Sequence, residues 1–554
     1  MRKTYYGIAV LCMAVLAMDA GDLKGQGSPR ITLLQEFRPI GGSGNNLQNP
    51  NLDPVPGAPE IALAPLNFAG PNDGLITGPN PRTISNAISG GTGANGQNAQ
   101  TTDPTLSAWL YVFGQFIDHD LDLEYTPLTT GDISIAVPKK DPVFPPNTVI
   151  QMTRDVRNPK TNTIINTTAG YLDLSQLYGS DEVTAASLRN SDGTLKTSDG
   201  GQALPAVNDQ FVTGDPRVME NPELSAITIL FMREHNFWVS QLKARNPTWT
   251  GDQLYNMAKA ITTAEYQNIV YQEFVPALIG PVLGQYPGYN PTVNAQVSQE
   301  FSTAAFRVGH SQVSGTQEGI DVNGKTTFTQ SLAVAFTNTP ETDEANGIND
   351  LLRALGTDFS QATDVYAVPE LRNLLIAGLV GGEVDKLDLI AIDIQRERDV
   401  GLASLNQTRI ALGMRPYRSF ADLTSDRVLQ AAFQRVYGSI DQVDLFMGGL
   451  AEAHAPGAAV GPTFQAILAK QFQALRVGDR FFWARQGFDR STALMIASTK
   501  LSDLIKRDAA TPNVQKSVFI QANLPLTSPK PRLPLPFPVN GHGHKVPFFK
   551  DDGM

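Results

Sequence analysis

The chain has 554 residues, of which 41% are hydrophobic, so it is long and apolar enough to bury a large core. It carries 54 acidic and 43 basic side chains and a formal net charge of −11, which argues against nucleic acids and anionic membranes as partners. No repeat with a period of roughly 20–50 residues is present, which excludes solenoid and propeller architectures.

Residues 1–20 have the features of a secretory signal peptide. Arg2 and Lys3 precede an apolar run over residues 5–18, which is too short to stay in a bilayer as a spanning helix. The only cysteine, Cys12, lies within this run, so the processed chain would contain no disulfide. We therefore expect a secreted or periplasmic protein, and the absence of disulfides fits a bacterial periplasm or medium better than an animal extracellular space.

Composition distinguishes an arm and a tail from the rest of the chain. Residues 21–100 are rich in Gly, Pro and Asn and show few helical periods, which predicts an extended arm lying over the body of the protein. No linker interrupts the stretch between residues 100 and 510, so we expect one domain there. Residues 525–554 are rich in proline, and His542 and His544 fit a flexible tail better than a metal site.

The stretch from Asp103 to Asp122 has the pattern of an amphipathic helix. Asp103 offers a capping oxygen and Pro104 a fixed φ, so we expect the helix to begin there. Apolar residues then recur at intervals of three and four and form one broad stripe: Leu106, Trp109, Leu110, Phe113, Phe116 and Ile117. Polar residues lie on the opposite side: Gln115, Asp118, His119 and Asp122.

Asp120 departs from the pattern of this helix. At about 100° per residue its side chain swings back onto the apolar stripe, where an ionised carboxylate is costly unless a cation meets it. A solvated polar face would explain the other polar residues of the stretch, but it does not explain Asp120.

The segment GQFIDHDLD, which contains this polar face, closely resembles the distal-helix motif of the animal-type haem peroxidases, the family of the leukocyte, milk and thyroid enzymes. Other signatures of that family follow in the family's order: GSGNNLQNP (42–50), NPRTISNAIS (80–89), LDLSQLYGS (172–180), GDPRVMENPEL (214–224), MREHN (232–236), FRVGH (306–310), IDIQRERDVG (392–401), FMGGL (446–450) and GDRFFW (478–483). The resemblance covers roughly residues 37–510. It implies one large, mainly α haem-peroxidase domain over residues 101–524, with little β-structure.

The six histidines differ in their surroundings, and two of them lie in the C-terminal tail. His454 lies in a Gly/Pro/Ala loop with no partner in sight. His235 continues an apolar helical stripe that starts after the capping sequence at residues 221–223, so we expect it in the core. His119 and His310 remain as the candidates for chemistry at an iron.

The resemblance assigns the distal side of a haem to three residues. His119 matches the distal histidine, whose neutral imidazole takes a proton from peroxide and returns it. Arg217 matches the catalytic arginine, which stabilises charge on the departing oxygen, although a loop salt bridge is the alternative for this side chain. Gln115 matches the amide that holds water or halide. The implied activity is a haem-dependent peroxidase that reduces hydrogen peroxide and oxidises small (pseudo)halides or phenolic and aromatic donors, with haem b as cofactor.

The proximal side is implied by three further matches. His310 matches the ligand of the haem iron, and Arg307 matches the arginine that meets a haem propionate. Asp393 stands where the family commonly has Asn. A carboxylate there would draw the imidazole toward imidazolate and lower the potential of the iron, which makes oxidation of chloride doubtful.

Two carboxylates match those that form ester bonds to haem methyl groups in mammalian members. Asp118 and Glu220 therefore make covalent haem plausible, with plain hydrogen bonding as the alternative. The methionine that forms a sulfonium link in the leukocyte enzyme is replaced by Asn221, so no such bond is expected.

The resemblance also implies a calcium ion, which would supply the cation that Asp120 needs. Oxygen ligands at alternating positions suit a hard cation. The expected ligands are Asp120, Thr168, Ala169, Tyr171, Asp173 and Ser175. Where the family has a threonine that gives both carbonyl and hydroxyl, this chain has Ala169, and Thr168 lies one place earlier.

Two other functions are compatible with the same motifs. A fatty-acid dioxygenase or cyclooxygenase-like enzyme would carry a radical-forming tyrosine three residues before the proximal histidine, where this chain has Arg307. A non-catalytic exported adhesion protein would not need His119, Arg217 and His310 together. Both comparisons favour the peroxidase.

Overall fold

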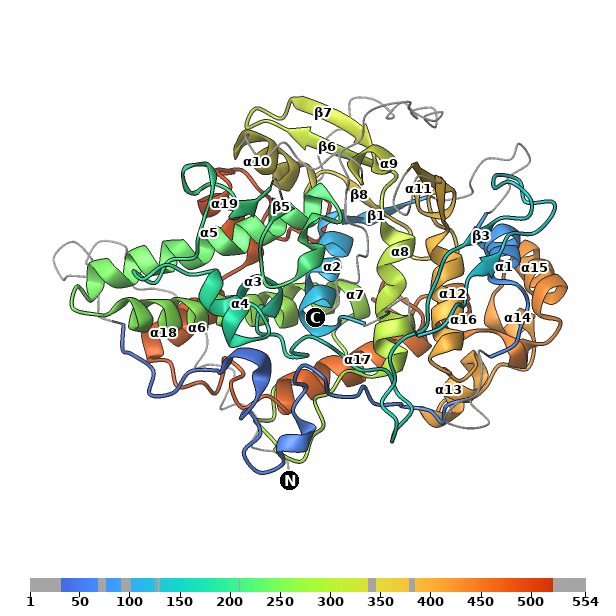
Figure 1. Cartoon of the computed structure of the whole chain (residues 1–554), viewed down its shortest axis with the longest axis horizontal. Coiled ribbons are helices and arrows are strands. Elements are labelled where there is room, and N and C mark those ends of the chain that lie inside the picture. The colour runs from blue at the N-terminus through green and yellow to red at the C-terminus, as the bar shows by residue number, and fades with distance from the viewer. Residues whose placement is uncertain are drawn as a thin grey trace, which may run out of the picture.

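The computed structural model describes residues 31–67, 76–90, 101–124, 126, 130–208, 210–336, 345–377 and 384–521. The predicted signal peptide (1–20) and proline-rich tail (525–554), with its two histidines, lie outside these ranges. Helices make up most of the regular secondary structure in these ranges (Figure 1). Among the described residues, no helix has both the length and the apolar character needed to cross a membrane.

The helices follow one another along the whole described chain. The α-helices are α1 (Pro81–Ile84), α2 (Trp109–Leu121), α3 (Ser175–Tyr178), α4 (Glu182–Ser187), α5 (Pro222–Arg245), α6 (Gly251–Ile269), α7 (Val275–Ile279), α8 (Gly309–Gln312), α9 (Leu332–Ala335), α10 (Ala345–Ala354), α11 (Pro369–Arg372), α12 (Leu389–Asp399), α13 (Leu405–Ala411), α14 (Phe420–Leu423), α15 (Arg427–Tyr437), α16 (Leu445–Ala451), α17 (Pro462–Val477), α18 (Arg490–Ser498) and α19 (Leu501–Asp508). Short 3₁₀ or π segments are η1 (Ile40–Gly42), η2 (Pro50–Leu52), η3 (Ser85–Ser89), η4 (Asp199–Gly201), η5 (Pro216–Met219), η6 (Val270–Phe274), η7 (Phe301–Ala305), η8 (Phe306–Val308) and η9 (Ile440–Gln442).

The strands are short and pair only two at a time. They are β1 (Thr102–Ser107), β2 (Ile135–Ala136), β3 (Val149–Ile150), β4 (Ala206–Val207), β5 (Gln210–Phe211), β6 (Thr316–Ile320), β7 (Thr326–Ser331), β8 (Phe359–Gln361), β9 (Leu374–Ala377) and β10 (Val384–Leu387). The pairs in the described residues are β1–β8, β2–β3, β4–β5, β6–β7 and β9–β10, all antiparallel. The predicted class, mainly α with little β, is confirmed.

The start of the central helix was predicted wrongly. Helix α2 begins at Trp109 and not at Asp103, because residues 102–107 form β1 against β8. The Asp103 carboxylate accepts hydrogen bonds from the backbone N–H groups of Thr105 (2.7 Å) and Leu106 (3.0 Å), so it caps a local turn. The Asp103-Pro104 pair therefore caps a turn instead of a helix, and α2 begins only after the pairing of β1 with β8 ends.

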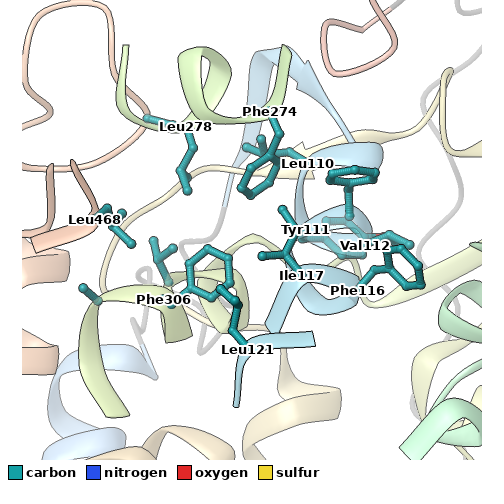
Figure 2. Packing of buried hydrophobic residues seen from close by; sticks show 14 of the residues in the cluster. Leu110, Tyr111, Val112, Phe116, Ile117, Leu121, Phe274, Leu278, Phe306 and Leu468 are labelled. Carbon is teal, nitrogen blue, oxygen red and sulfur yellow. The ribbon is translucent and has the colours of Figure 1, made fainter. Parts of the chain in front are cut away.

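The predicted apolar stripe of α2 is confirmed as the centre of the main core. Five of its residues lie in α2 and are almost completely buried, as is Leu106 in β1: Trp109, Leu110, Phe113, Phe116 and Ile117. Figure 2 shows Leu110, Phe116 and Ile117 among side chains that come from other helices, including Phe274 and Phe306. The Phe116 ring stacks on Phe231 of α5 at 5.0 Å. This packing fixes the rotation of α2 and so the direction of its polar face.

Two of the histidines have structural roles. His235 of α5 is completely buried, as predicted, with Nδ1 3.0 Å from the Tyr178 hydroxyl and Nε2 3.0 Å from the Gly193 carbonyl. Burial lowers the pKa of His235 to about 4, so it stays neutral. The expectation that His454 has no partner is wrong, because its Nε2 lies 2.7 Å from the Thr363 carbonyl.

The described part of the N-terminal arm is tied to the helical body by buried polar contacts. Arg38 binds Asp479 at 2.6 Å, and Arg82 of α1 binds Asp388 at 2.7 Å. The Ser302 hydroxyl donates a 2.7 Å hydrogen bond to Glu60. These contacts hold the arm against segments hundreds of residues away. The proposed limits of arm, domain and tail themselves stay predictions.

Candidate active site

Helix α2 carries the distal candidates on one side. His119 is buried, with Nδ1 3.8 Å from Asp215 and Nε2 3.5 Å from Glu220. Gln115 lies one turn earlier on the helix and, like Asp118, is partly exposed. Two carboxyl groups therefore flank the imidazole, one near each ring nitrogen.

Arg217 is held from both sides in η5. Asp215 caps this turn by accepting from the Arg217 backbone N–H (2.7 Å), and its carboxylate also binds the guanidinium at 2.7 Å. The same guanidinium donates to the Asp122 carbonyl (2.7 Å), which ends α2. Burial would raise the pKa of Asp215, but the charge of Arg217 and then that of His119 bring this pKa below its ordinary value. Arg217 is thus a fixed positive charge beside His119.

A chain of amide hydrogen bonds lies next to these residues. Asn221 caps α5 by accepting from the Leu224 N–H at 2.9 Å. Its Nδ2 donates to Gln115 Oε1 at 2.9 Å, and Gln115 Nε2 donates to Glu220 Oε2 at 3.0 Å. The chain ends beside His119.

The proximal candidates Arg307 and His310 lie on three consecutive helical segments, η7, η8 and α8. Figure 1 shows α8 beside α2. His310 Nδ1 lies 2.7 Å from Asp393 Oδ2, and Asp393 on α12 is completely buried. Because an ionised carboxylate only accepts, Nδ1 is the donor in this bond. Arg307 donates to the other Asp393 oxygen at 3.1 Å and to Glu124 at 2.5 Å.

Asp118 connects the two sides electrostatically. Burial raises its pKa above the ordinary value, while the positive charges of His119, Arg217, Arg307 and His310 oppose that rise. The residue therefore lies within reach of both candidate histidines and both arginines.

The residues fit a haem between α2 and α8. The candidates on both sides keep partial exposure in the interior: Gln115, Asp118, Arg217, Glu220, Arg307 and His310. A Cβ added at Gly309, the residue before His310, would meet no atom within 4 Å apart from its chain neighbours, so there is open space at this point of α8. In the described residues nothing bonds His310 Nε2, which leaves this nitrogen available to an iron.

Three of the expected calcium ligands, Asp120, Asp173 and Ser175, lie together, but Asp120 already has partners. Its carboxylate accepts from the N–H groups of Asp173 (3.0 Å), Leu174 (3.1 Å) and Ser175 (2.6 Å), and from the Ser175 hydroxyl (2.9 Å). Leu174 adopts a left-handed conformation (φ 63°), which turns these successive amides toward Asp120. The Thr168 hydroxyl lies 2.8 Å from that of Ser180.

A calcium ion fits the donor chemistry of this loop. Burial, and then the charge of Asp173, raise the pKa of Asp120 well above its ordinary value. Asp173 Oδ1 is buried without a hydrogen-bond partner in the described part of the chain. There, no three His, Cys, Asp or Glu side chains gather closely enough to hold a metal alone, so carbonyl and hydroxyl oxygens would have to complete the site.

Sequence reasoning missed three residues of the site. Asp215 holds Arg217 and lies near His119, Glu124 bonds Arg307, and Asn221 holds Gln115. The Asp-Pro pair at residues 215–216 is a capping signal that could have revealed the first. No local signal marks Glu124.

Comparisons with known proteins give a consistent result. The family model described as animal haem peroxidase matches residues 37–519. Peroxinectin A from Dictyostelium discoideum is 32% identical, over 88% of this chain and 96% of that protein. Human eosinophil peroxidase is 30% identical, over 88% of this chain and 77% of its own length.

Two solved structures share the fold. The structure of peroxidase A from Dictyostelium discoideum has a TM-score of 0.78 at 29% identity and covers 88% of this chain and all of its own. A fatty acid α-dioxygenase from Arabidopsis thaliana has a TM-score of 0.74 at 19% identity, over 92% of this chain and 88% of its own, which shows a common fold and no more.

Proposed function

Because this chain belongs to the animal haem peroxidase family, we propose that His119, Arg217 and Gln115 form the distal catalytic side of its haem and that His310 binds the iron. The protein is a haem peroxidase, which reduces hydrogen peroxide while oxidising small donors. The observation that carries the residue assignment is the geometry of the two histidines: His119 and Arg217 both lie against Asp215, and His310 Nδ1 lies 2.7 Å from the buried Asp393.

The distal residues have two different roles: His119 transfers a proton, and Arg217 provides a fixed positive charge. Bound haem supplies the iron that accepts oxidising equivalents from peroxide and passes them to the donor. His119 would take a proton from peroxide and return it to the departing oxygen. Arg217, whose pKa is raised by Asp215, stays charged and stabilises the negative charge that develops there. Asp215 and the Asp122 carbonyl keep this guanidinium in place.

The proximal residues set the electronic character of the iron. His310 would hold the iron through Nε2, while its Nδ1 donates to Asp393 and Arg307 donates to the other oxygen of that carboxylate. Arg307 is also the candidate for binding a haem propionate. A carboxylate partner makes the imidazole a stronger donor, so donors easier to oxidise than chloride, such as phenols or iodide, are the proposed substrates.

Two finer features of the cofactor site belong to the same proposal. Asp118 and Glu220 are both partly exposed, so their carboxylates could form ester bonds with haem. Calcium would be held by Asp120, Asp173 and Ser175, with the carbonyl of Tyr171. We further propose that the chain is exported through its N-terminal signal.

The test is a Soret band together with peroxide-dependent oxidation of a phenol by the purified protein. We expect both for the wild type, no stable band for His310→Ala, and a band with little activity for His119→Ala. A wild-type protein with haem but no peroxide reaction would instead support a non-catalytic protein. Oxygenation of a fatty acid without peroxide turnover would support the dioxygenase, against which Arg307 speaks.

A further inference from the structure

The orientation of the Gln115 amide can be derived from the backbone. A backbone N–H can only donate, so the Asn221 atom that meets the Leu224 N–H (2.9 Å) must be the side-chain oxygen. The Asn221 nitrogen then faces Gln115, and a nitrogen donor requires the Gln115 oxygen opposite it (2.9 Å). The orientation of both amides therefore rests on the start of α5 and on no assumption about the atoms themselves.

This orientation decides what the amide offers to the active site. With its oxygen bound by Asn221, Gln115 must turn its nitrogen toward Glu220, where it donates at 3.0 Å. The NH₂ group has a second hydrogen, and Gln115 is partly exposed, so that hydrogen is available to a small acceptor in the accessible space. Glu220 is in turn held as an acceptor 3.5 Å from His119 Nε2.

We propose that Asn221 is a positioning residue for the peroxide reaction: it fixes the Gln115 amide with its donor end toward the distal space and so presents a hydrogen-bond donor to peroxide or to a small anion. The inference rests on the distal roles proposed above for His119 and Gln115. Asn221 itself is nearly buried and acts only through Gln115.

A cap-preserving substitution separates this role from the structural one. Asp caps a helix as well as Asn, so Asn221→Asp keeps the bond from Leu224, but its second oxygen cannot donate to Gln115. The Gln115 amide then turns over and presents its oxygen toward Glu220, where two acceptors repel. Asn221→Ser also keeps the cap, but its short side chain leaves the amide free to adopt either orientation. The matched control is Asn80→Asp in α1, which loses one donation to the Ala136 carbonyl (2.8 Å) and keeps its cap on Thr83.

The measurements use the haem-loaded ferric protein with fluoride, a small acceptor whose binding is followed by the shift of the Soret band. We expect Asn221→Asp to weaken fluoride binding and to slow the peroxide reaction, each by about tenfold, as the loss of one hydrogen bond implies. Asn221→Ser should lie between this variant and the wild type. All three variants should unfold near the wild-type temperature, and Asn80→Asp should bind fluoride as the wild type does.

Wild-type fluoride affinity in a folded Asn221→Asp protein would overturn the proposal, as would equal losses in this variant and in Asn80→Asp. If Asn221→Asp does not fold, Asn221→Ser decides, and wild-type affinity there would also overturn the inference. A wild-type protein that holds haem but does not react with peroxide would refute the proposed function first, which is a separate outcome.

Discussion

The hydrogen bond between His310 and Asp393 should set the reduction potential of the iron. Asp393 accepts from His310 at 2.7 Å with one oxygen and from Arg307 at 3.1 Å with the other, and it is completely buried. An asparagine has only one oxygen, so Asp393→Asn can accept from one of these donors and must turn its NH₂ group toward the other. We expect it to keep the bond to His310 as a neutral one and to release Arg307.

The size of the effect follows from the charge of the bond. A charge-assisted hydrogen bond is about twice as strong as a neutral one, a difference of about 1.5 kcal/mol. A carboxylate stabilises the more positive ferric state, and only the part of this difference that is absent from the ferrous state changes the potential. For a one-electron couple, the expected rise in the ferric/ferrous potential is therefore at most about 60 mV.

Spectroelectrochemical titration of the Soret band measures this potential directly. The matched control is Glu124→Gln, which changes the other partner of Arg307 (2.5 Å) and leaves the His310 bond intact, so its shift should be much smaller. An unchanged or lowered potential in Asp393→Asn, or equal shifts in the two variants, would refute the reasoning.

Four further outcomes are expected. His119→Ala should keep haem and slow peroxide reduction by about 10²–10⁴-fold, and more than Arg217→Ala, in stopped-flow measurements; wild-type rates would rule out the proton-transfer role. If Asp118 and Glu220 form esters, haem should stay with the chain in acidified organic solvent after turnover, and Asp118→Val and Glu220→Gln should each remove one bond; free haem from an active, cycled sample would exclude them. Strong chelation should lower the unfolding temperature and the activity together, and Asp120→Ala should do the same; an active protein without calcium by elemental analysis contradicts this. Burial, and then Glu234, raise the pKa of Asp508 to about 9. Between about pH 4 and 9 the folded protein therefore binds more protons than the unfolded chain, and its stability falls as the pH rises. In thermal unfolding measured over this pH range, Asp508→Asn should flatten the dependence of stability on pH.

The parts of the site that the sequence predicted are those encoded over short distances. The apolar stripe of α2 and the buried His235 follow from helical periodicity, and the structure confirms both. The start of α2 could not be predicted in this way, because Asp103 and Pro104 are a proper capping pair. Pairing of β1 with β8 over more than two hundred residues decided the outcome, and no local pattern records that partner.

The residues that the sequence did not reveal depend on contacts between distant segments. Glu124 has no periodic or capping role, and its function appears only where Arg307 and Arg396 meet it in space. Asn221 shows its helix cap in the sequence, but its donation to Gln115 requires α2 and α5 to lie side by side. The contact of His454 with the Thr363 carbonyl likewise joins two segments that are far apart in the chain, so the sequence did not reveal it.

The order of the residues Asp118, His119 and Asp120 follows from the geometry of α2. Successive side chains on a helix point about 100° apart, so three neighbours face three different directions. Asp118 is partly exposed, His119 turns toward Asp215 and Glu220, and Asp120 turns toward the amides of residues 173–175. A slip of one residue would place an imidazole against the amides and a carboxylate against Asp215. The bonds of Asp120 therefore do more than satisfy a buried side chain: because these amides need a hydrogen-bond acceptor, they help to hold the rotation of α2 that turns His119 toward Asp215 and Glu220.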